Sequence, residues 1–418
     1  MPVPGEEFTA RVEAVAYPGR GIVRLQGAVV FVEGLLPGEE AHLRVTRVKP
    51  RYAVAEVVEL LASSPDRLPV ARDPRAFLHA PGCVYDHATH AAEVRIKQSQ
   101  LESFLRRLPC GAPPFDAPFV SPLAEHYRNK IVLHAAWGGA GGAGAPAGLR
   151  RGGRSLRLGY VRDDGVKGVT DVAECLLARE PINARLRGLR EQPATLARLR
   201  PGQTVTLRWT EYDGVMWWID SPANPPILTE SSPLGPMLVP ADGFYQVNPE
   251  VAAALVAHVR DAFVAAGGAG RPLLDLYCGV GVFGLAGALA GGTPLLGVES
   301  FAPCLRMARR NAVALGVEGA RFEAMDVARW LRSASADAFP WPDATVLLDP
   351  PRAGVATGAL EAIASRLPAR IGYVSCEPAT LARDLGRLVA AGYRPLRARL
   401  FDMFPRTAHF ESFVWMER

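Results

Sequence analysis

A cysteine near the end of the chain is the strongest candidate for a nucleophile. Cys376 follows the apolar segment 370–375 and lies two residues before a proline that can open a helix. Most lone cysteines are packed and inert, but a helix N-terminus favours the reactive thiolate. A general base could be His409 or Glu411, which are two residues apart and would share one face of a short strand.

A glycine-rich loop upstream could bind a cofactor. Segment 274–284 ends a predicted strand and opens a predicted helix, and it contains Gly-x-Gly-x-x-Gly at Gly279, Gly281 and Gly284. Glycines at this spacing let the backbone approach a ligand closely. Glu299, at the end of the next predicted strand, can accept hydrogen bonds from ribose hydroxyls. Binding sites for NAD and for S-adenosylmethionine both have a glycine-rich loop and an acidic residue at the end of the next strand.

Two acidic residues favour S-adenosylmethionine. Asp275 lies four positions before the first glycine, in the form Asp-x-x-x-Gly-x-Gly that is typical of class I methyltransferases. Asp349 opens the segment Asp-Pro-Pro-Arg, which occurs at methyl-transfer sites and is not expected of a dehydrogenase. An NAD-dependent enzyme is therefore the weaker hypothesis.

The candidate residues fall at the ends of predicted parallel strands. From about residue 244 onward, apolar segments alternate with helical stretches, which is typical of a parallel sheet with helices on both faces. Ligands of such sheets bind at the carboxyl ends of the strands. We therefore predict an α/β class I methyltransferase domain with a Rossmann-like sheet, whose strands lie at 273–277, 295–299, 320–323, 345–349 and 370–375.

The rest of the chain predicts two further β units and a helix. Residues 1–62 are typical of a small β-barrel, with alternating segments at 8–15, 21–25, 28–32, 41–48 and 51–60. Residues 93–108 predict an amphipathic helix whose apolar stripe has a polar step at 97/98. We expect a mixed central β domain over 63–92 and 110–236, and a catalytic domain over 93–109 and 237–418.

Composition excludes several classes of protein. The chain has 418 residues, of which 49% are hydrophobic and 21% charged, as in ordinary globular proteins. No apolar run reaches the about 20 residues of a membrane-spanning helix, and the first residues do not resemble a signal peptide. The six cysteines form no Cys-x-x-Cys pair. We therefore expect a cytoplasmic protein with reduced thiols, no metal site and no membrane contact.

Basic side chains concentrate in the middle of the chain. Residues 145–210 carry a larger excess of basic over acidic residues than the net charge of +5 for the whole protein. Arg150, Arg151, Arg154 and Arg157 cluster there beside a Gly/Ala-rich tract. Such a cluster is an expected footprint of nucleic-acid binding, and a merely solvated face is the alternative.

A cysteine, a base and a methyl donor together suit one reaction. Addition of a thiolate to carbon 6 of uracil makes carbon 5 nucleophilic, and a base must later remove the carbon 5 proton. In order and spacing, the motifs resemble those of the RNA uracil-5 methyltransferase family, and the N-terminal unit resembles a TRAM domain, an RNA-binding β-barrel. The matching segments are 244–248, 275–281, 349–352, 373–376 and 402–411.

The resemblance implies roles for single residues. Cys376 aligns with the nucleophile and Glu411 with the base, so His409 becomes a neighbour. Phe244 falls where an aromatic ring stacks on the flipped uracil, and Arg128 lies in a segment that resembles a basic, RNA-facing one. The S-adenosylmethionine site is predicted to comprise Gln246, Tyr277, Gly279, Gly281, Glu299, Asp326 and Asp349.

The implied activity is S-adenosylmethionine-dependent formation of 5-methyluridine in RNA. The TRAM-like barrel favours 23S ribosomal RNA, because the branch of the family that acts on transfer RNA typically lacks this domain. A monomeric, cytoplasmic enzyme of ribosomal RNA processing is therefore expected. The alternatives are a transfer RNA uridine-5 methyltransferase and a non-catalytic RNA-binding descendant of the family.

The family's iron–sulfur site is incomplete in this sequence. Members of this branch often bind a cluster through four cysteines, but Pro74 and Ala80 occupy two of these positions. Only Cys83 and Cys175 remain, which is too few for an ordinary four-cysteine cluster. The sequence therefore predicts a protein without a cluster.

Three further positions depart from the family pattern. Glu377 and Leu315 stand where asparagine is usual, and Val282 stands where threonine or asparagine is usual. Glu377 matters most because it follows the nucleophile directly. If its carboxylate pointed inward, it would raise the pKa of Cys376 and slow the reaction.

Overall fold

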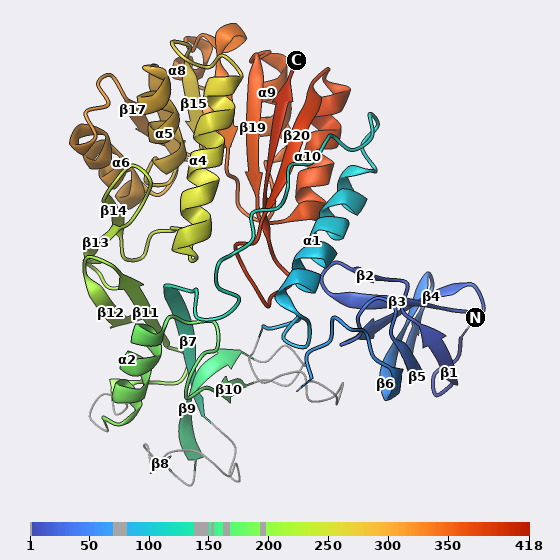
Figure 1. Cartoon of the computed structure of the whole chain (residues 1–418). Helices are drawn as coiled ribbons and strands as arrows, with labels where there is room; N and C mark the ends of the chain where they lie inside the picture. The colour runs from blue at the N-terminus through green and yellow to red at the C-terminus, as the bar shows by residue number, and fades with distance from the viewer. Residues whose placement is uncertain (1, 70–81, 138–149, 152–153, 162–167, 193–197) are drawn as a thin grey trace.

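Three larger β-sheets follow one another along the chain (Figure 1). The computed structural model describes residues 2–69, 82–137, 150–151, 154–161, 168–192 and 198–418. The Gly/Ala-rich tract, Pro74, Ala80 and the side chains of Arg150, Arg151 and Arg154 lie outside the described part. Within that part, no helix combines the length and the apolar character that crossing a membrane requires.

The N-terminal sheet forms the predicted small barrel. Its six strands have the order β1-β5-β6-β4-β3-β2. β1 and β2 are neighbours in the sequence but lie at opposite edges, so the sheet must curl back on itself. The strands are β1 (Glu7–Arg11), β2 (Ala14–Ala16), β3 (Arg20–Leu25), β4 (Ala28–Glu33), β5 (Glu40–Lys49) and β6 (Tyr52–Ala62).

The single strand predicted over 8–15 is wrong, because the chain changes partner in its middle. The amide of Val12 donates to the carbonyl of Glu39 (2.8 Å), whereas the amide of Glu13 donates to the carbonyl of Ile22 (2.9 Å). Val12 is buried in the barrel core. Alternating polarity predicted the extended backbone but could not reveal that it crosses from one edge of the sheet to the other.

A second antiparallel sheet follows, in the order β10-β9-β7-β11-β12, with β8 paired to β9. Helix α2 packs on this sheet and buries Ile182, Leu186 and Leu189 against it. The elements are β7 (Lys130–Trp137), β8 (Arg150–Arg151), β9 (Arg154–Val161), β10 (Val169–Asp171), α2 (Glu180–Arg190), β11 (Thr204–Thr210) and β12 (Gly214–Ile219). A short hairpin of β13 (Ile227–Glu230) and β14 (Met237–Pro240) leads out of it.

The C-terminal sheet has seven strands in the order β17-β16-β15-β18-β19-β21-β20. Only β21 is antiparallel to its two neighbours. The five predicted parallel strands are all present, and their observed ends differ from the predicted ones by at most one residue. The strands are β15 (Leu273–Leu276), β16 (Leu295–Glu299), β17 (Arg321–Ala324), β18 (Thr345–Leu348), β19 (Arg370–Ser375), β20 (Arg394–Phe401) and β21 (Glu411–Glu417). This order confirms the class I methyltransferase fold.

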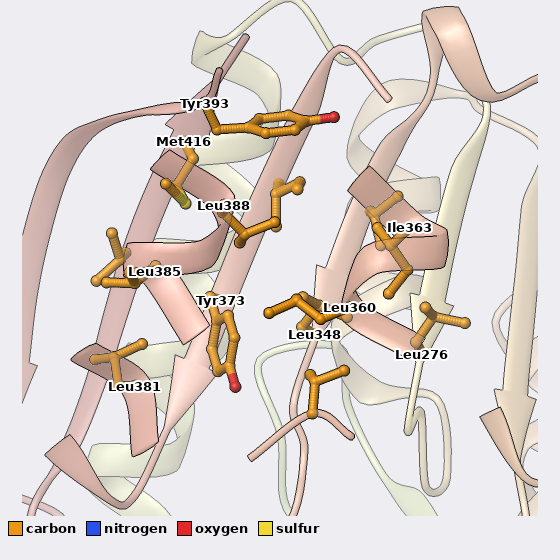
Figure 2. Packing of buried hydrophobic residues seen from close by; sticks show 14 of the residues in the cluster. Leu276, Leu348, Leu360, Ile363, Tyr373, Leu381, Leu385, Leu388, Tyr393 and Met416 are labelled. Carbon is orange, nitrogen blue, oxygen red and sulfur yellow. The ribbon is translucent and has the colours of Figure 1, made fainter. Parts of the chain in front are cut away.

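Helices cover this sheet and hold its strands in place. Figure 2 shows Leu360 of α9 and Leu381 of α10 among the side chains that pack beside Leu348 and Tyr373 of the sheet. The Tyr373 hydroxyl also donates to Asp384 of α10 (2.7 Å). The helices are α4 (Pro249–Ala265), α5 (Val282–Gly291), α6 (Ala302–Ala314), α7 (Val327–Trp330), α8 (Ala334–Asp337), the 3₁₀ helix η1 (Trp341–Asp343), α9 (Thr357–Ser365) and α10 (Pro378–Ala390).

In helix α1 (His90–Leu105), the polar step in the apolar stripe is a buried lysine, Lys97. Lys97 is wholly buried, and its Nζ donates to Glu93 Oε1 (2.6 Å), Asp402 Oδ1 (3.0 Å) and the carbonyl of Phe404 (3.0 Å). This buried ion cluster ties α1 to the segment between β20 and β21. The sequence did not predict it, because a lysine in a helix is usually solvated.

Removing Lys97 should strongly destabilise the protein. A Lys97→Met substitution fills the space but removes the ammonium that Glu93 and Asp402 share in the interior, and removing one partner of a buried ion pair typically costs about 3–5 kcal/mol. Urea unfolding should show this loss, whereas Lys49→Met, at an exposed lysine of β5, should change stability little. A loss below about 1 kcal/mol in Lys97→Met would contradict a structural role for the cluster.

Candidate active site

The nucleophile and base candidates meet at the carboxyl edge of the C-terminal sheet. β19 pairs with β21 up to Ser375 opposite Ser412, so Cys376 and Glu411 are neighbours where the pairing ends. Asp349 follows β18, which pairs with β19 on its other side. Two carboxyl groups therefore lie beside one thiol.

The environment of the Cys376 thiol opposes its ionisation. Burial raises the pKa of Cys376 to about 12, the carboxylates of Glu411 and Asp349 add to this, and the Arg352 guanidinium acts in the opposite direction. Helix α10 begins at Pro378, as predicted. The pKa of Cys376 is nevertheless raised, because burial and the two carboxylates disfavour the thiolate. Without bound ligands, the thiol form is therefore favoured, contrary to the expectation from the helix N-terminus. A cationic ligand near these carboxylates would offset their effect.

Glu411 is buried at the first position of β21, and its Oε2 has no hydrogen-bond partner within the described residues. Burial and the Asp349 carboxylate raise the pKa of Glu411 well above its usual range. A carboxylate with a raised pKa is a stronger base once it is ionised. The prediction that His409 shares a strand face with Glu411 is wrong, because His409 lies before β21 in a loop.

The glycine-rich loop joins β15 to α5 in a left-handed backbone conformation. Gly279 and Gly281 have φ values of 54° and 85°, and Tyr277 has a φ of 64°. Gly284 lets helix α5 lie close to Asp275, and its amide donates to Asp275 Oδ2 (2.9 Å). A Cβ at this position would lie 2.7 Å from the same oxygen and would prevent this approach. Burial raises the pKa of Asp275 to about 8. Asp275 therefore supports the loop from within the fold.

The Glu299 carboxylate is fixed beside this loop. Its Oε2 accepts from the amide of Gly279 (3.2 Å) and its Oε1 from the amide of Phe301 (2.7 Å). Because a carboxylate oxygen has more than one lone pair, ribose hydroxyls could still donate to it. Asp326 lies after β17, where its Oδ1 accepts from the amide of Arg329 (2.9 Å) and caps α7.

Buried polar atoms without partners also point to a ligand. Within the described residues, Gln246 Oε1 is buried and makes no hydrogen bond. Such atoms are rare in folded proteins and call for a ligand or water. Together with the Glu299 carboxylate and the open glycine loop, this orphaned atom fits a nucleoside ligand with an amino acid end, such as S-adenosylmethionine.

Binding of S-adenosylmethionine should strengthen with rising pH. Burial and the nearby Glu299 carboxylate raise the pKa of Asp349 to about 7, so Asp349 is largely neutral at pH 6 and ionised at pH 8. Only the ionised form attracts a sulfonium. We expect the dissociation constant to fall about tenfold over this range in calorimetry. S-adenosylhomocysteine, whose sulfur is neutral, should show a weaker dependence, and Asp349→Asn should flatten it. Equal pH profiles for the two ligands would contradict this assignment.

The two predicted substrate residues differ in exposure. Phe244 is 68% exposed, as a ring that meets an incoming base must be. The Arg128 side chain is half-buried, and its guanidinium lies 5.8 Å from the ring of Phe404 and donates to the Tyr127 hydroxyl (3.3 Å). The side chain of Asn129 is buried, and its Nδ2 donates to Glu230 Oε2 (3.1 Å). The segment is thus less open than the resemblance implied, and the role of Arg128 in RNA binding stays a prediction.

Cys83 and Cys175 both lie in the core of the central domain. The Tyr160 hydroxyl donates to Cys175 Sγ (3.2 Å). Over the described residues, no group of three or more histidine, cysteine or acidic side chains could hold a metal ion.

One residue at the site was not predicted. Tyr17 belongs to the loop between β2 and β3 of the barrel, yet its hydroxyl lies 2.9 Å from Glu377 Oε2 and 3.0 Å from His409 Nδ1. No local spacing could have revealed a contact between residues 360 positions apart. The barrel therefore contributes directly to the surroundings of Cys376.

Comparison with known proteins supplies the family. The model for tRNA (Uracil-5-)-methyltransferases matches residues 238–418, and the TRAM domain model matches residues 3–58. A protein of Methylococcus capsulatus, named 23S rRNA (uracil(1939)-C(5))-methyltransferase RlmD, is 30% identical over 100% of this chain and 98% of its own. The chain belongs to the RNA uracil-5 methyltransferase family. It is thus an S-adenosylmethionine-dependent RNA (uracil-5-)-methyltransferase with an N-terminal TRAM domain, which confirms the resemblance.

A further relative and a solved structure are also similar to this chain. An RNA methyltransferase of Streptomyces coelicolor is 31% identical over 99% of this chain and 93% of its own. The crystal structure of the Pyrococcus abyssi tRNA (uracil-54, C5)-methyltransferase with S-adenosyl-L-homocysteine superposes with a TM-score of 0.69, at 23% identity, over 97% of this chain and 100% of that one. The whole architecture is therefore shared with a solved structure.

Proposed function

We propose that this enzyme methylates carbon 5 of one uridine in 23S ribosomal RNA through a covalent bond between Cys376 and carbon 6 of the base. The observation that carries this proposal is the meeting of Cys376, Glu411 and Asp349 at one sheet edge. The name of the full-length relative from Methylococcus capsulatus supports the ribosomal substrate.

Each residue of the edge has one task in this reaction. Bound S-adenosylmethionine supplies a methyl group on a positively charged sulfur. The Cys376 thiolate adds to carbon 6, and the electron pair displaced to carbon 5 takes the methyl group. Glu411 then removes the carbon 5 proton, the bond between sulfur and carbon 6 breaks, and 5-methyluridine is released. The ionised Asp349 favours the sulfonium before transfer.

The cofactor site is assigned to the glycine loop and the strand ends around it. Glu299 would accept from the ribose hydroxyls, Asp326 would contact the adenine, and Gln246 and Tyr277 would line the remaining length of the ligand. Gly279 and Gly281 leave room for it to approach the backbone. The fixed Glu299 carboxylate and the orphaned Gln246 oxygen support this assignment.

RNA would bind across all three parts of the chain. We assign RNA binding to the barrel (1–62) and the central domain (63–92 and 110–236), and catalysis to 93–109 and 237–418. The target uridine must leave its stack, which costs a few kcal/mol and is cheapest in a single-stranded loop. Phe244, which is exposed, would stack on the flipped base.

Nucleoside mass spectrometry tests the substrate. Ribosomal and transfer RNA from cells with and without the gene are digested separately, and 5-methyluridine is quantified and mapped in each pool. The proposal predicts loss of one 5-methyluridine from 23S ribosomal RNA and no change in transfer RNA. Loss confined to transfer RNA would favour the substrate named for the Pyrococcus abyssi structure, and no change in either pool would contradict both.

We further propose that the enzyme works without an iron–sulfur cluster. Among the described residues, Cys83 and Cys175 have no third cysteine beside them, and Cys175 is hydrogen-bonded to Tyr160. Anaerobically purified protein should contain far less than one iron and one sulfide per chain. Stoichiometric iron and acid-labile sulfide would overturn this proposal.

A further inference from the structure

The barrel reaches the catalytic edge through one side chain. The Tyr17 ring packs edge-on against Phe104 of α1 (6.0 Å between centroids) and Phe410 beside β21 (6.2 Å). Gln100 of α1 holds strand β2, which leads into Tyr17, since its Nε2 donates to the carbonyl of Val15 (3.1 Å). Tyr17 is thus fixed by packing on both sides, and its hydroxyl lies between Glu377 and His409.

The hydroxyl of Tyr17 has one proton to donate, and the geometry assigns it to Glu377. A carboxylate oxygen can only accept, so the phenol donates to Glu377 Oε2 (2.9 Å). The phenol oxygen then accepts from His409 Nδ1–H (3.0 Å). Burial and the Arg352 charge lower the pKa of His409 to about 4, so its ring is a neutral donor at physiological pH. Burial and the bond to Glu377 raise the pKa of Tyr17, so the phenol keeps its proton.

This arrangement matters because Glu377 directly follows Cys376. The charged groups that act most strongly on the thiol are Glu411 at the start of β21, Asp349 after β18, and Arg352 in the loop beyond. Burial, Glu411 and Asp349 raise the pKa of Cys376 most, although Glu377 is the nearest acidic residue in the sequence. Its carboxylate instead bonds to Tyr17 and, more weakly, to the amide of Ala379 (3.5 Å).

We propose that Tyr17 is a positioning residue, which holds the Glu377 carboxylate away from the Cys376 sulfur so that the thiolate can form. This inference rests on the proposed function only in giving Cys376 the role of nucleophile. It explains how the chain tolerates an acidic residue where its family usually has asparagine. It also gives the TRAM domain a second task, since the domain that binds RNA would then also tune the reactivity of the thiol.

Alkylation of the full-length protein by iodoacetamide, without RNA or cofactor, tests this inference. The rate constant at Cys376 follows the thiolate fraction, and mass spectrometry resolves it from that of Cys110, which is exposed and serves as an internal reference. Tyr17→Phe keeps the packed ring but frees Glu377. We expect the Cys376 rate at pH 8 to fall about three- to tenfold, with no change at Cys110.

Charge removal at Glu377 separates positioning from a purely structural effect. The double variant Tyr17→Phe/Glu377→Gln should regain the wild-type rate at Cys376, and Glu377→Gln alone should differ little from wild type. An unchanged or faster rate in Tyr17→Phe would overturn the proposal, as would a double variant that stays slow. Because the assay uses neither RNA nor S-adenosylmethionine, its outcome is independent of the substrate test above.

Discussion

Replacing Cys376 by alanine should abolish methyl transfer while leaving both ligands bound. Carbon 5 of uracil is not nucleophilic without addition at carbon 6, so the loss in turnover should be on the order of 10⁴ or more. The side chain is only half-buried at the sheet edge, and its removal should barely affect folding. Transfer of a labelled methyl group from S-adenosylmethionine to RNA measures the loss.

A matched cysteine provides the control for this variant. Cys110 is exposed and lies outside the site, so Cys110→Ala should retain full activity. Equilibrium binding of RNA and of S-adenosylmethionine to Cys376→Ala should stay within about threefold of wild type. Methyl transfer within tenfold of wild type would show that another group attacks the ring, or that the reaction proceeds without an adduct.

Replacing Glu411 by glutamine should stall the reaction after methyl transfer. Without the base, the carbon 5 proton stays in place and the bond between Cys376 and carbon 6 cannot break by elimination. A positioned general base typically contributes about 10²–10⁴ in rate. We therefore expect a loss of this size in multiple turnovers, together with a protein–RNA adduct that survives denaturing electrophoresis and carries the transferred methyl group.

The Glu411→Gln protein should remain folded. Burial and Asp349 raise the pKa of Glu411, so ionisation of this carboxyl opposes folding, and a neutral side chain of the same shape removes that cost at neutral pH. Glu417→Gln, at the other end of β21, is the control and should form 5-methyluridine at the wild-type rate. Normal turnover in Glu411→Gln, or slow turnover with no adduct, would assign the base to another residue.

Much of the catalytic fold could be predicted because its signals are local. Apolar segments of four to six residues followed by Gly279, Glu299, Asp349 and Cys376 indicated parallel strands with chemistry at their ends. A parallel sheet brings such ends to one edge whatever the order of its strands. The class I architecture therefore needed no knowledge of long-range contacts, and the family match confirms it.

The remaining features depend on contacts between distant parts of the chain. In the sequence, Lys97 only interrupts the apolar stripe of an amphipathic helix. In the folded chain it is paired with Asp402, which is 305 positions away. Nothing near Tyr17 indicates that it meets Glu377. The raised pKa of Cys376 also has a tertiary origin, in burial and in Glu411 and Asp349. Sequence periodicity carries no information about such pairings, which only the folded chain creates.

The central claim is that Cys376 forms a covalent bond with the target base, and RNA containing 5-fluorouridine at the mapped position tests it most directly. The sulfur adds and the methyl group transfers, but fluorine at carbon 5 cannot leave as a proton, so the adduct persists. With S-adenosylmethionine present, we expect mass spectrometry to find the Cys376 peptide bonded to a methylated fluorouridine. If a protein that methylates the ordinary RNA gave no adduct, or gave one at a different residue, Cys376 would not be the nucleophile.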